Sequence, residues 1–241
     1  MGAPTAPART EDQTGARRLA LGAGLGLVAA ILTIALPLVF LYLATYDPGG
    51  FFTFTSTLFS VLSILVLAGA ILFLLSLFVY RRGYATLRKV DGRFWTASVL
   101  CLIGSIGFLL IVVLAAVVLG SPGSLSSCLH GAPSHALSCL RSSQPIGAYS
   151  GLVGFALTWL GGIGIVLGLF LAGSRFARGA LSGGAVLYLL LLLVLVGPFL
   201  ALLVPIPGTQ YVLLVAPLLA ILAPALVLGG ALRPLSAVRS A

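Results

Sequence analysis

The sequence predicts an all-α, polytopic integral membrane protein with six transmembrane helices. The chain has 241 residues, of which 60% are hydrophobic and 7% charged, and its mean hydropathy is +1.22. Soluble domains do not have this composition. The charges also gather in short patches between long uncharged runs, such as the 28 residues between Arg18 and Asp47. A bilayer core takes about 20 apolar residues per helix, so every such run predicts at least one crossing.

The span boundaries follow from the runs and their breaks. Residues 1–17 are short, polar and rich in Ala, Pro and Thr, so we expect a disordered cytoplasmic tail before a transmembrane domain at 18–241. The first apolar run is too long for a signal peptide, which predicts a retained helix. Pro205 to Gln210 divides the last run, because proline and glycine interrupt helices. The expected spans are 19–45, 53–80, 96–120, 147–173, 181–204 and 211–232, with an outer loop at 121–146.

The basic residues predict how the chain is threaded. Twelve of the 13 Lys and Arg residues lie in segments that six crossings would place on one side of the membrane, and Arg141 lies on the other. Cytoplasmic segments of membrane proteins carry the excess of Lys and Arg. The chain is therefore expected in a plasma membrane with both termini on the cytoplasmic side. The net charge of the chain is +9, and the basic residues that produce it lie at the ends of the expected spans. This placement predicts contact with lipid and no nucleic-acid partner.

The expected outer loop holds two of the three cysteines. Cys128 and Cys139 would face an oxidising compartment, which favours a disulfide between them. Together with His130 and His135 they would also supply four zinc ligands, although their spacing matches no recognised zinc pattern. Free thiols are the third alternative. Cys101 lies inside a span and is expected to act as a small apolar side chain.

One expected span carries a seam of small residues. Small residues three or four positions apart lie on one helix face and let two helices approach closely in lipid. Contact within the chain's own bundle is the favoured interpretation, and a homo-oligomer or a membrane-protein partner is the alternative. Trp159 lies beside the seam, and its N–H needs a hydrogen-bond acceptor such as a Ser or Thr hydroxyl. The seam consists of Gly147, Gly151, Gly154, Gly161, Gly164 and Gly168.

The expected inner loop between spans two and three is the most basic segment. Each positive charge near anionic lipid gains on the order of 1 kcal/mol, so the loop is a candidate headgroup contact. Membrane orientation alone also explains these charges. The residues are Arg81, Arg82, Arg88, Lys89 and Arg93.

Two short patterns resemble a known family. Gly83-x-x-x-Leu87-x-x-x-Asp91-x-Arg93-Phe94 leads into a helix, and Gly161-Gly162-Ile163-Gly164 with Gly168 precedes Arg175-Phe176. Together, over about residues 80–180, they resemble an archaeal family of small multi-pass membrane proteins known only as a domain of unknown function. The resemblance implies an archaeal plasma membrane, and it supplies no functional residue to carry over.

The interior of the spans limits the function classes. No ionisable residue lies in the middle of any span, which argues against a proton-coupled transporter or an intramembrane hydrolase. We expect no enzymatic activity and no cofactor. The favoured function is a structural or accessory membrane protein that packs with itself, lipid or other membrane proteins. The alternative is a transporter or channel for a neutral or hydrophobic solute, lined by hydroxyls and by carbonyls freed at Pro37, Pro198, Pro217 and Pro224.

Overall fold

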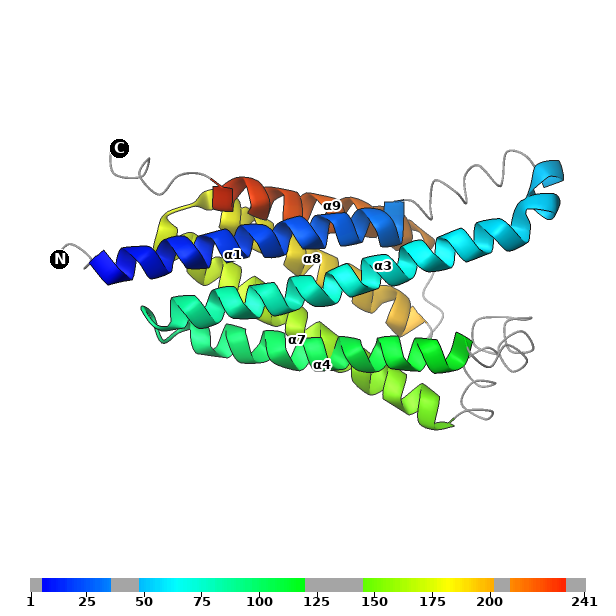
Figure 1. The fold of residues 1–241 in the computed structure, drawn as a ribbon, viewed down its shortest axis with the longest axis horizontal. Helices are drawn as coiled ribbons and strands as arrows, with labels where there is room; N and C mark the ends of the chain where they lie inside the picture. Colours follow the sequence, from blue (N-terminus) through cyan, green and yellow to red (C-terminus); the bar gives the residue numbers. More distant parts are fainter. Residues whose placement is uncertain (1–5, 36–47, 120–144, 202–208, 233–241) are drawn as a thin grey trace.

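The computed structural model describes residues 6–35, 48–119, 145–201 and 209–232 (Figure 1). The described parts are helical, which confirms the all-α prediction, and they contain no strand. Five helices are long and apolar enough to cross a membrane, and α8 is apolar but shorter over its described side chains, Gly179–Val194. The elements are α1 (Ala6–Ala30), its π-helical continuation η1 (Ile31–Ala35), α3 (Pro48–Arg88), α4 (Phe94–Leu119), α7 (Pro145–Phe176), α8 (Gly179–Ala201) and α9 (Thr209–Leu232).

Local chemistry explains several helix ends. Both α3 and α7 begin at a proline, which is tolerated there because the first turn of a helix leaves its N–H groups unpaired. The side chain of Asp91 caps α4, since its Oδ1 accepts a hydrogen bond from the Arg93 N–H at 3.0 Å. The α7 helix ends where Ala177 takes a φ of 51°. This left-handed residue closes the helix, and the Arg178 N–H then donates to the Gly173 carbonyl at 2.9 Å.

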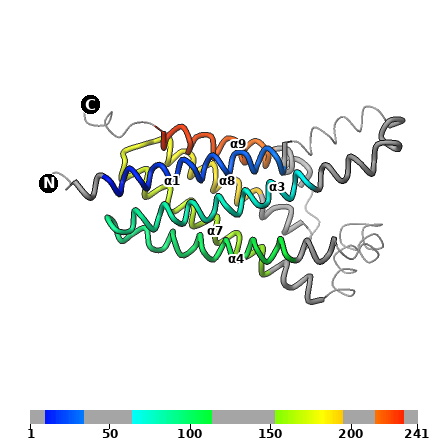
Figure 2. Tube along the Cα trace, viewed as in Figure 1, coloured from blue at the N-terminus to red at the C-terminus, as the bar shows by residue number. Residues whose placement is uncertain are grey.

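The six helices form a ring in chain order. Each helix packs against the next, and α9 packs against α1, so that the first and last helices close the ring (Figures 1 and 2). Across the ring, α3 touches α7 only weakly. Side chains fill the interior, and the largest that are fully buried include Tyr80, Tyr84, Leu77 and Leu169. The start of α1 and the end of α9 lie at the same end of the ring (Figure 1).

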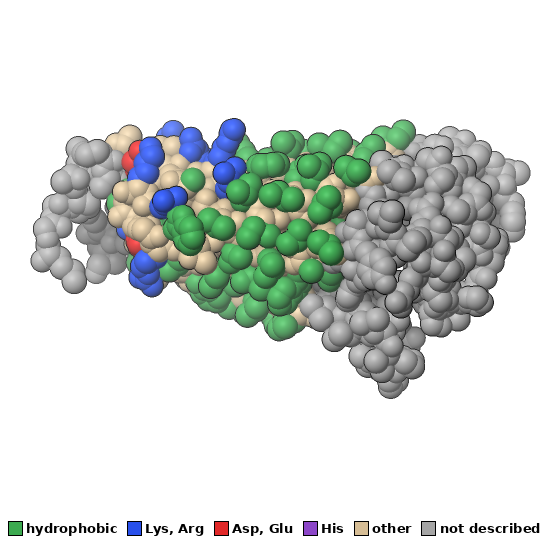
Figure 3. All heavy atoms as spheres, turned by 90° about the horizontal axis from the view of Figure 1, so that it is seen from below, with side chains coloured by type: hydrophobic (Ala, Val, Ile, Leu, Met, Phe, Trp, Pro, Cys, Tyr) green, Lys and Arg blue, Asp and Glu red, His purple; other side chains and the backbone are tan. Residues whose placement is uncertain are grey.

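The outer surface of the ring is apolar. Large hydrophobic side chains such as Leu21, Ile64, Leu193 and Leu218 are more than half exposed. Figure 3 shows a broad hydrophobic surface next to an end that carries the Lys and Arg side chains. A soluble monomer rarely exposes so much contiguous apolar surface, whereas in lipid such exposure is favourable. The distribution of polarity therefore agrees with a membrane protein.

The structure corrects the prediction of a disordered tail. Residues 6–17 form the first three turns of α1, and Ala16 is already buried in the core. Sequence reasoning missed this because it considered only that the stretch is short, polar and rich in Ala, Pro and Thr, whereas Glu11 and Asp12 pair with Lys89 and Arg175. The α3 helix also continues past the expected end of the second span, residue 80, as far as Arg88. The end of the expected first span, 36–45, lies outside the described residues.

Candidate functional sites: a hydroxyl cluster and a basic end

The predicted glycine seam on α7 lies against α4 of the same chain. A Cβ atom placed on Gly161 would lie 2.5 Å from the Gly104 Cα, and one on Gly154 would lie 2.9 Å from the Gly107 carbonyl oxygen. Gly164 similarly faces the backbone at Cys101. Gly168, further along, faces the ring of Tyr84 on α3. From Gly154 to Gly168 the seam is therefore occupied within the monomer. Gly147 and Gly151 belong to α7, but their surroundings lie outside the described side chains.

Hydroxyl groups gather inside the ring between α1, α3 and α8. Ser76 donates from its Oγ to the Gly22 carbonyl at 2.7 Å, and Tyr84 donates to the Ile165 carbonyl at 3.1 Å. Tyr80 is fully buried, and its hydroxyl has no hydrogen-bond partner among the described residues. The Tyr188 hydroxyl lies near enough to interact with it, but the geometry of the pair does not complete a hydrogen bond.

Gly26 lies in close contact with this hydroxyl cluster. A Cβ placed on Gly26 would lie 3.2 Å from the Ser76 Oγ and 3.6 Å from the Tyr188 hydroxyl oxygen. The ring of Pro224, inside α9, lies 3.9 Å from the same point. Proline has no N–H group, so the carbonyl one turn earlier, at Ala220, loses its helical partner. Residues of four helices, α1, α3, α8 and α9, thus meet at this point, and α3 and α8 contribute hydroxyl groups.

Two further polar groups on α7 and α4 bond to backbone. Trp159 donates from Nε1 to the Leu192 carbonyl of α8 at 3.3 Å. The indole N–H therefore has the acceptor that it was expected to need, and this acceptor is a backbone carbonyl and not a Ser or Thr hydroxyl. Cys101 is fully buried and lies 3.9 Å, measured from Sγ, from the Gly161 carbonyl oxygen, as expected of a small, largely apolar side chain.

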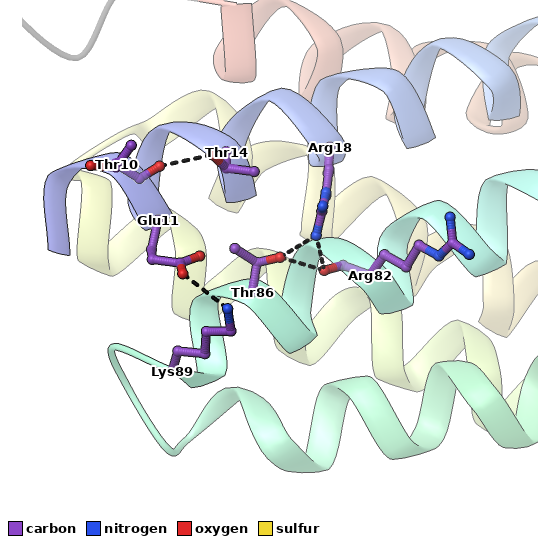
Figure 4. A network of polar contacts seen from close by, with 7 residues as sticks. All are labelled: Thr10, Glu11, Thr14, Arg18, Arg82, Thr86 and Lys89. Atoms are coloured by element: carbon purple, nitrogen blue, oxygen red, sulfur yellow. Dashed lines mark hydrogen bonds and ion pairs between the residues drawn. The ribbon is translucent and has the colours of Figure 1, made fainter. Parts of the chain in front are cut away.

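Ion pairs at the basic end attach the start of α1 to the α3–α4 hairpin and to α7. Glu11 pairs with Lys89 at 3.0 Å (Figure 4). Arg175 donates to both carboxylate oxygens of Asp12, at 2.9 and 3.1 Å, and its Nη1 lies 3.9 Å from the Asp91 carboxylate. Bidentate pairs of this kind are geometrically specific.

A hydrogen-bonded contact lies next to these ion pairs. Arg18 on α1 donates to the Thr86 hydroxyl and to the Arg82 carbonyl of α3, the latter at 3.3 Å (Figure 4). Thr86 in turn donates to the same Arg82 carbonyl at 2.9 Å. The network therefore holds α1 to α3 one turn deeper than the ion pairs do.

The residues predicted to contact anionic lipid lie at this end. Arg82, Arg88 and Arg93 are exposed, Arg81 is half-buried, and Lys89 is exposed although it pairs with Glu11. The three described acidic residues are engaged in ion pairs, so the surface of this end keeps a positive excess (Figure 3).

Arg178 has a role that sequence reasoning missed. It is buried, 6% exposed, and its Nη1 donates to the carbonyls of Gly230 and Ala231 at 2.8 and 3.2 Å. These carbonyls belong to the last turn of α9, which a cation stabilises. In the sequence analysis, Arg178 was only one of the basic residues that predict how the chain is oriented in the membrane. Arg178 lies between Ala177, which ends α7, and Gly179, the first residue of α8, and only the fold shows that it caps α9.

Comparison of the chain with protein-family models, with curated proteins and with solved structures finds no match. The resemblance of residues 80–180 to an archaeal family stays a prediction. The structure does bring its two patterns together, because Gly168 faces Tyr84 and Arg175 lies near Asp91. Cys128 and Cys139, and with them the predicted disulfide and its zinc alternative, lie outside the described residues.

Proposed function

We propose that this chain is an integral membrane protein of structural or accessory type, with both termini in the cytoplasm and no catalytic role. One observation carries the proposal: the helices close into a ring filled by side chains, and its charge is gathered at one end. Buried polar groups at catalytic centres pair with acids or bases, whereas the hydroxyl cluster contains only Ser and Tyr side chains.

The basic end supports a lipid contact. Arg82, Arg88 and Arg93 are exposed beside the exposed aromatic ring of Trp95, 51% accessible. Tryptophan favours the membrane interface, and cytoplasmic leaflets carry the anionic headgroups that bind exposed Arg side chains. We therefore propose that this end faces the cytoplasm and binds anionic lipid.

The contacts of the glycine seam limit which surfaces of the protein can bind a partner or a second copy. Between Gly154 and Gly168 the seam is occupied by α4 and α3, so a partner or a second copy would contact the outer apolar faces instead. Those faces are lined by Leu, Ile and Val side chains, which in lipid associate through van der Waals packing alone.

Isolation of the tagged, full-length chain from its native membrane in mild detergent tests the accessory role. We expect a homo-oligomer or a partner present in near-stoichiometric amount, measured by quantitative mass spectrometry, together with co-purified anionic lipid. The variant Arg82→Gln/Arg88→Gln/Arg93→Gln should lose most of that lipid. A chain that purifies as a monomer with no enrichment of anionic lipid contradicts the proposal.

The second candidate is a carrier or channel for a neutral solute, and the hydroxyl cluster favours it. Ser76, Tyr80 and Tyr188 place hydroxyls within the bundle, beside a proline that frees a carbonyl of α9. Proteoliposome flux of neutral solutes, measured by stopped-flow light scattering, tests it. Facilitated flux that Tyr80→Phe abolishes would favour transport over the accessory role.

A further inference from the structure

We propose that the acidic start of α1 is an internal competitor for the anionic headgroups that the basic end binds. The Glu11 carboxylate occupies Lys89, and headgroup phosphates of an anionic leaflet displace it. This proposal rests on the lipid contact proposed above and adds regulation to it. Where anionic lipid is abundant, the first turns of α1 are released and Lys89 becomes a further lipid contact.

The positions of the acidic residues place negative charge on two neighbours at once. Two of the four acidic residues of the chain are adjacent, Glu11 and Asp12. Neighbouring residues of an α-helix point about 100° apart, so the two carboxylates reach different partners. Glu11 pairs with Lys89, in the turn after α3, at 3.0 Å (Figure 4). Asp12 pairs with Arg175 of α7 at 2.9 Å. The start of α1 thus neutralises basic residues that lipid phosphates would otherwise contact.

The Glu11–Lys89 pair is the one that lipid can reach. The Lys89 side chain is 68% exposed and that of Glu11 is 32% exposed. The Arg175 and Asp12 side chains are more buried, and Arg175 has a second carboxylate, that of Asp91, at 3.9 Å. An exposed ion pair is weak, and the attraction of one Lys side chain to an anionic leaflet is of similar size. A leaflet rich in anionic headgroups can therefore exchange Glu11 for a phosphate at Lys89.

Release would be confined to the turns of α1 before Gly15. None of residues 10–14 is buried. Packing begins at Gly15, where a placed Cβ would lie 2.5 Å from the Leu87 side chain, and Leu19 is fully buried. Loss of the Glu11 pair therefore loosens residues 6–14 and leaves the rest of α1 in place. A helical segment of this length is marginal without tertiary contacts, so the released turns fray.

The freed Lys89 joins side chains that already form the proposed lipid contact. Arg88 precedes it in the chain, and Arg82 and Arg93 are exposed at the same end. While Glu11 is paired, its carboxylate cancels one of the positive charges that the leaflet would meet. One Lys or Arg near an anionic surface changes a binding constant about fivefold. Freeing Lys89 should therefore tighten the binding of anionic lipid by about this factor.

Hydrogen exchange of the full-length chain in nanodiscs tests the release. Nanodiscs of phosphatidylcholine are compared with nanodiscs that contain phosphatidylglycerol in equal amount. We expect the amides of residues 6–14 to exchange at least about fivefold faster in the anionic nanodiscs, while those of residues 19–26 stay unchanged. Glu11→Gln should show the faster exchange in both lipids. Inorganic phosphate added to the neutral nanodiscs is the control for a soluble anion and should have no effect.

Native mass spectrometry of the protein titrated with phosphatidylglycerol measures the affinity. Glu11→Gln should lower the dissociation constant about fivefold. The matched control is the same substitution in a Lys89→Gln chain, which has no ammonium group to free. There it should change the dissociation constant by less than about twofold. This comparison separates the release of Lys89 from the mere loss of a negative charge.

Equal exchange of residues 6–14 in the two kinds of nanodisc would overturn the proposal, and so would release by inorganic phosphate alone. An effect of Glu11→Gln that is as large in the Lys89→Gln chain would overturn it too. Circular dichroism verifies that each variant is folded. If a variant does not fold, hydrogen exchange of the wild-type chain decides alone.

The competition and the lipid contact on which it rests fail in different ways. Wild-type protein that binds phosphatidylglycerol, with no tighter binding in Glu11→Gln, contradicts the competition alone. Wild-type protein that does not bind it, while Glu11→Gln does, contradicts the lipid contact of the wild type and supports the competition. Absence of binding in both chains contradicts both.

Discussion

Glycines line several interfaces of the ring, and two of these interfaces, α4–α7 and α1–α3, show how different the neighbours of a glycine can be. At α4–α7, a Cβ on Gly161 would lie 2.5 Å from the Cα of Gly104, which is backbone. At α1–α3, a Cβ on Gly22 would lie 3.2 Å from the ring of Tyr80, which is a side chain. Backbone yields only if a whole helix moves, whereas a side chain can shift by itself. A methyl group would thus meet a rigid contact at Gly161 in the α4–α7 interface and an adaptable one at Gly22 in the α1–α3 interface.

The largest effect should come from Gly161→Ala. Its new methyl group has to separate α7 from α4, and we expect a loss of about 3 kcal/mol in the free energy of unfolding, as for severe overpacking. Denaturation of the protein in mixed micelles, followed by circular dichroism, measures the loss. Gly24→Ala is the control, since nothing lies within 4 Å of its placed Cβ. Equal stability of Gly161→Ala and Gly24→Ala would show that the α4–α7 interface is not rigid.

A loss of about 2 kcal/mol is expected for Arg178→Met, because charged hydrogen bonds to the α9 carbonyls are lost from a buried site. Arg178 adds a buried cation to the α8–α9 interface, where Gly184 and Gly230 also make close contacts, so this variant tests whether a side chain can hold two helices as firmly as backbone contact does. Thermal unfolding in detergent gives the comparison. Arg82→Met, at an exposed position, should change little, and an equal loss there would refute the capping role.

Asp12→Asn should lower stability by about 1 kcal/mol, because the bidentate pair with Arg175 is partly buried, with side-chain exposures of 18% and 23%. Glu11→Gln should have a smaller effect, since its partner Lys89 is 68% exposed and water screens the pair. Raising the salt concentration should reduce the difference between wild type and Asp12→Asn. A difference that does not depend on salt would mean that shape, and not charge, attaches α1 here.

The smallest effect is expected for Gly22→Ala, about 0.5 kcal/mol, because the Tyr80 ring can move away by a few tenths of an ångström and alanine favours the helix. The ratio of this loss to that of Gly161→Ala measures the contrast between the adaptable and the rigid interface. Hydrogen exchange of α1 and α7 backbone amides supplies an independent measure. A Gly22→Ala loss as large as that of Gly161→Ala would remove the contrast.

Much of the fold was predictable because hydropathy and proline positions act locally. Each described helix overlaps an expected span, and α9 begins at Thr209, within the stretch from Pro205 to Gln210. The start of α1 was not predictable in this way, because its helix depends on ion pairs to Lys89 and Arg175, distant in the sequence.

Less of the candidate sites than of the spans could be predicted from the sequence. The sequence showed the small-residue seam on α7, but only the structure shows that it packs against Gly104 and Gly107 of α4. The cluster at Tyr80 and Tyr188 combines ordinary span residues from α3 and α8, and no spacing rule links them. Apolar faces in lipid have little periodicity to tell inside from outside, so neither the ring nor its hydroxyls could be derived.

The contact between α1 and α9 has a consequence for biogenesis. During synthesis the helices leave the ribosome from first to last, and neighbours in the sequence can associate as soon as both have entered the bilayer. Among the described helices, this is the interface that joins the first helix to the last. Until α9 has been inserted, the flank of α1 near Gly26 that meets Pro224 faces lipid or a chaperone. Loss of the final helix would therefore leave the earliest one without its neighbour, and quality control would meet a bundle with an open side.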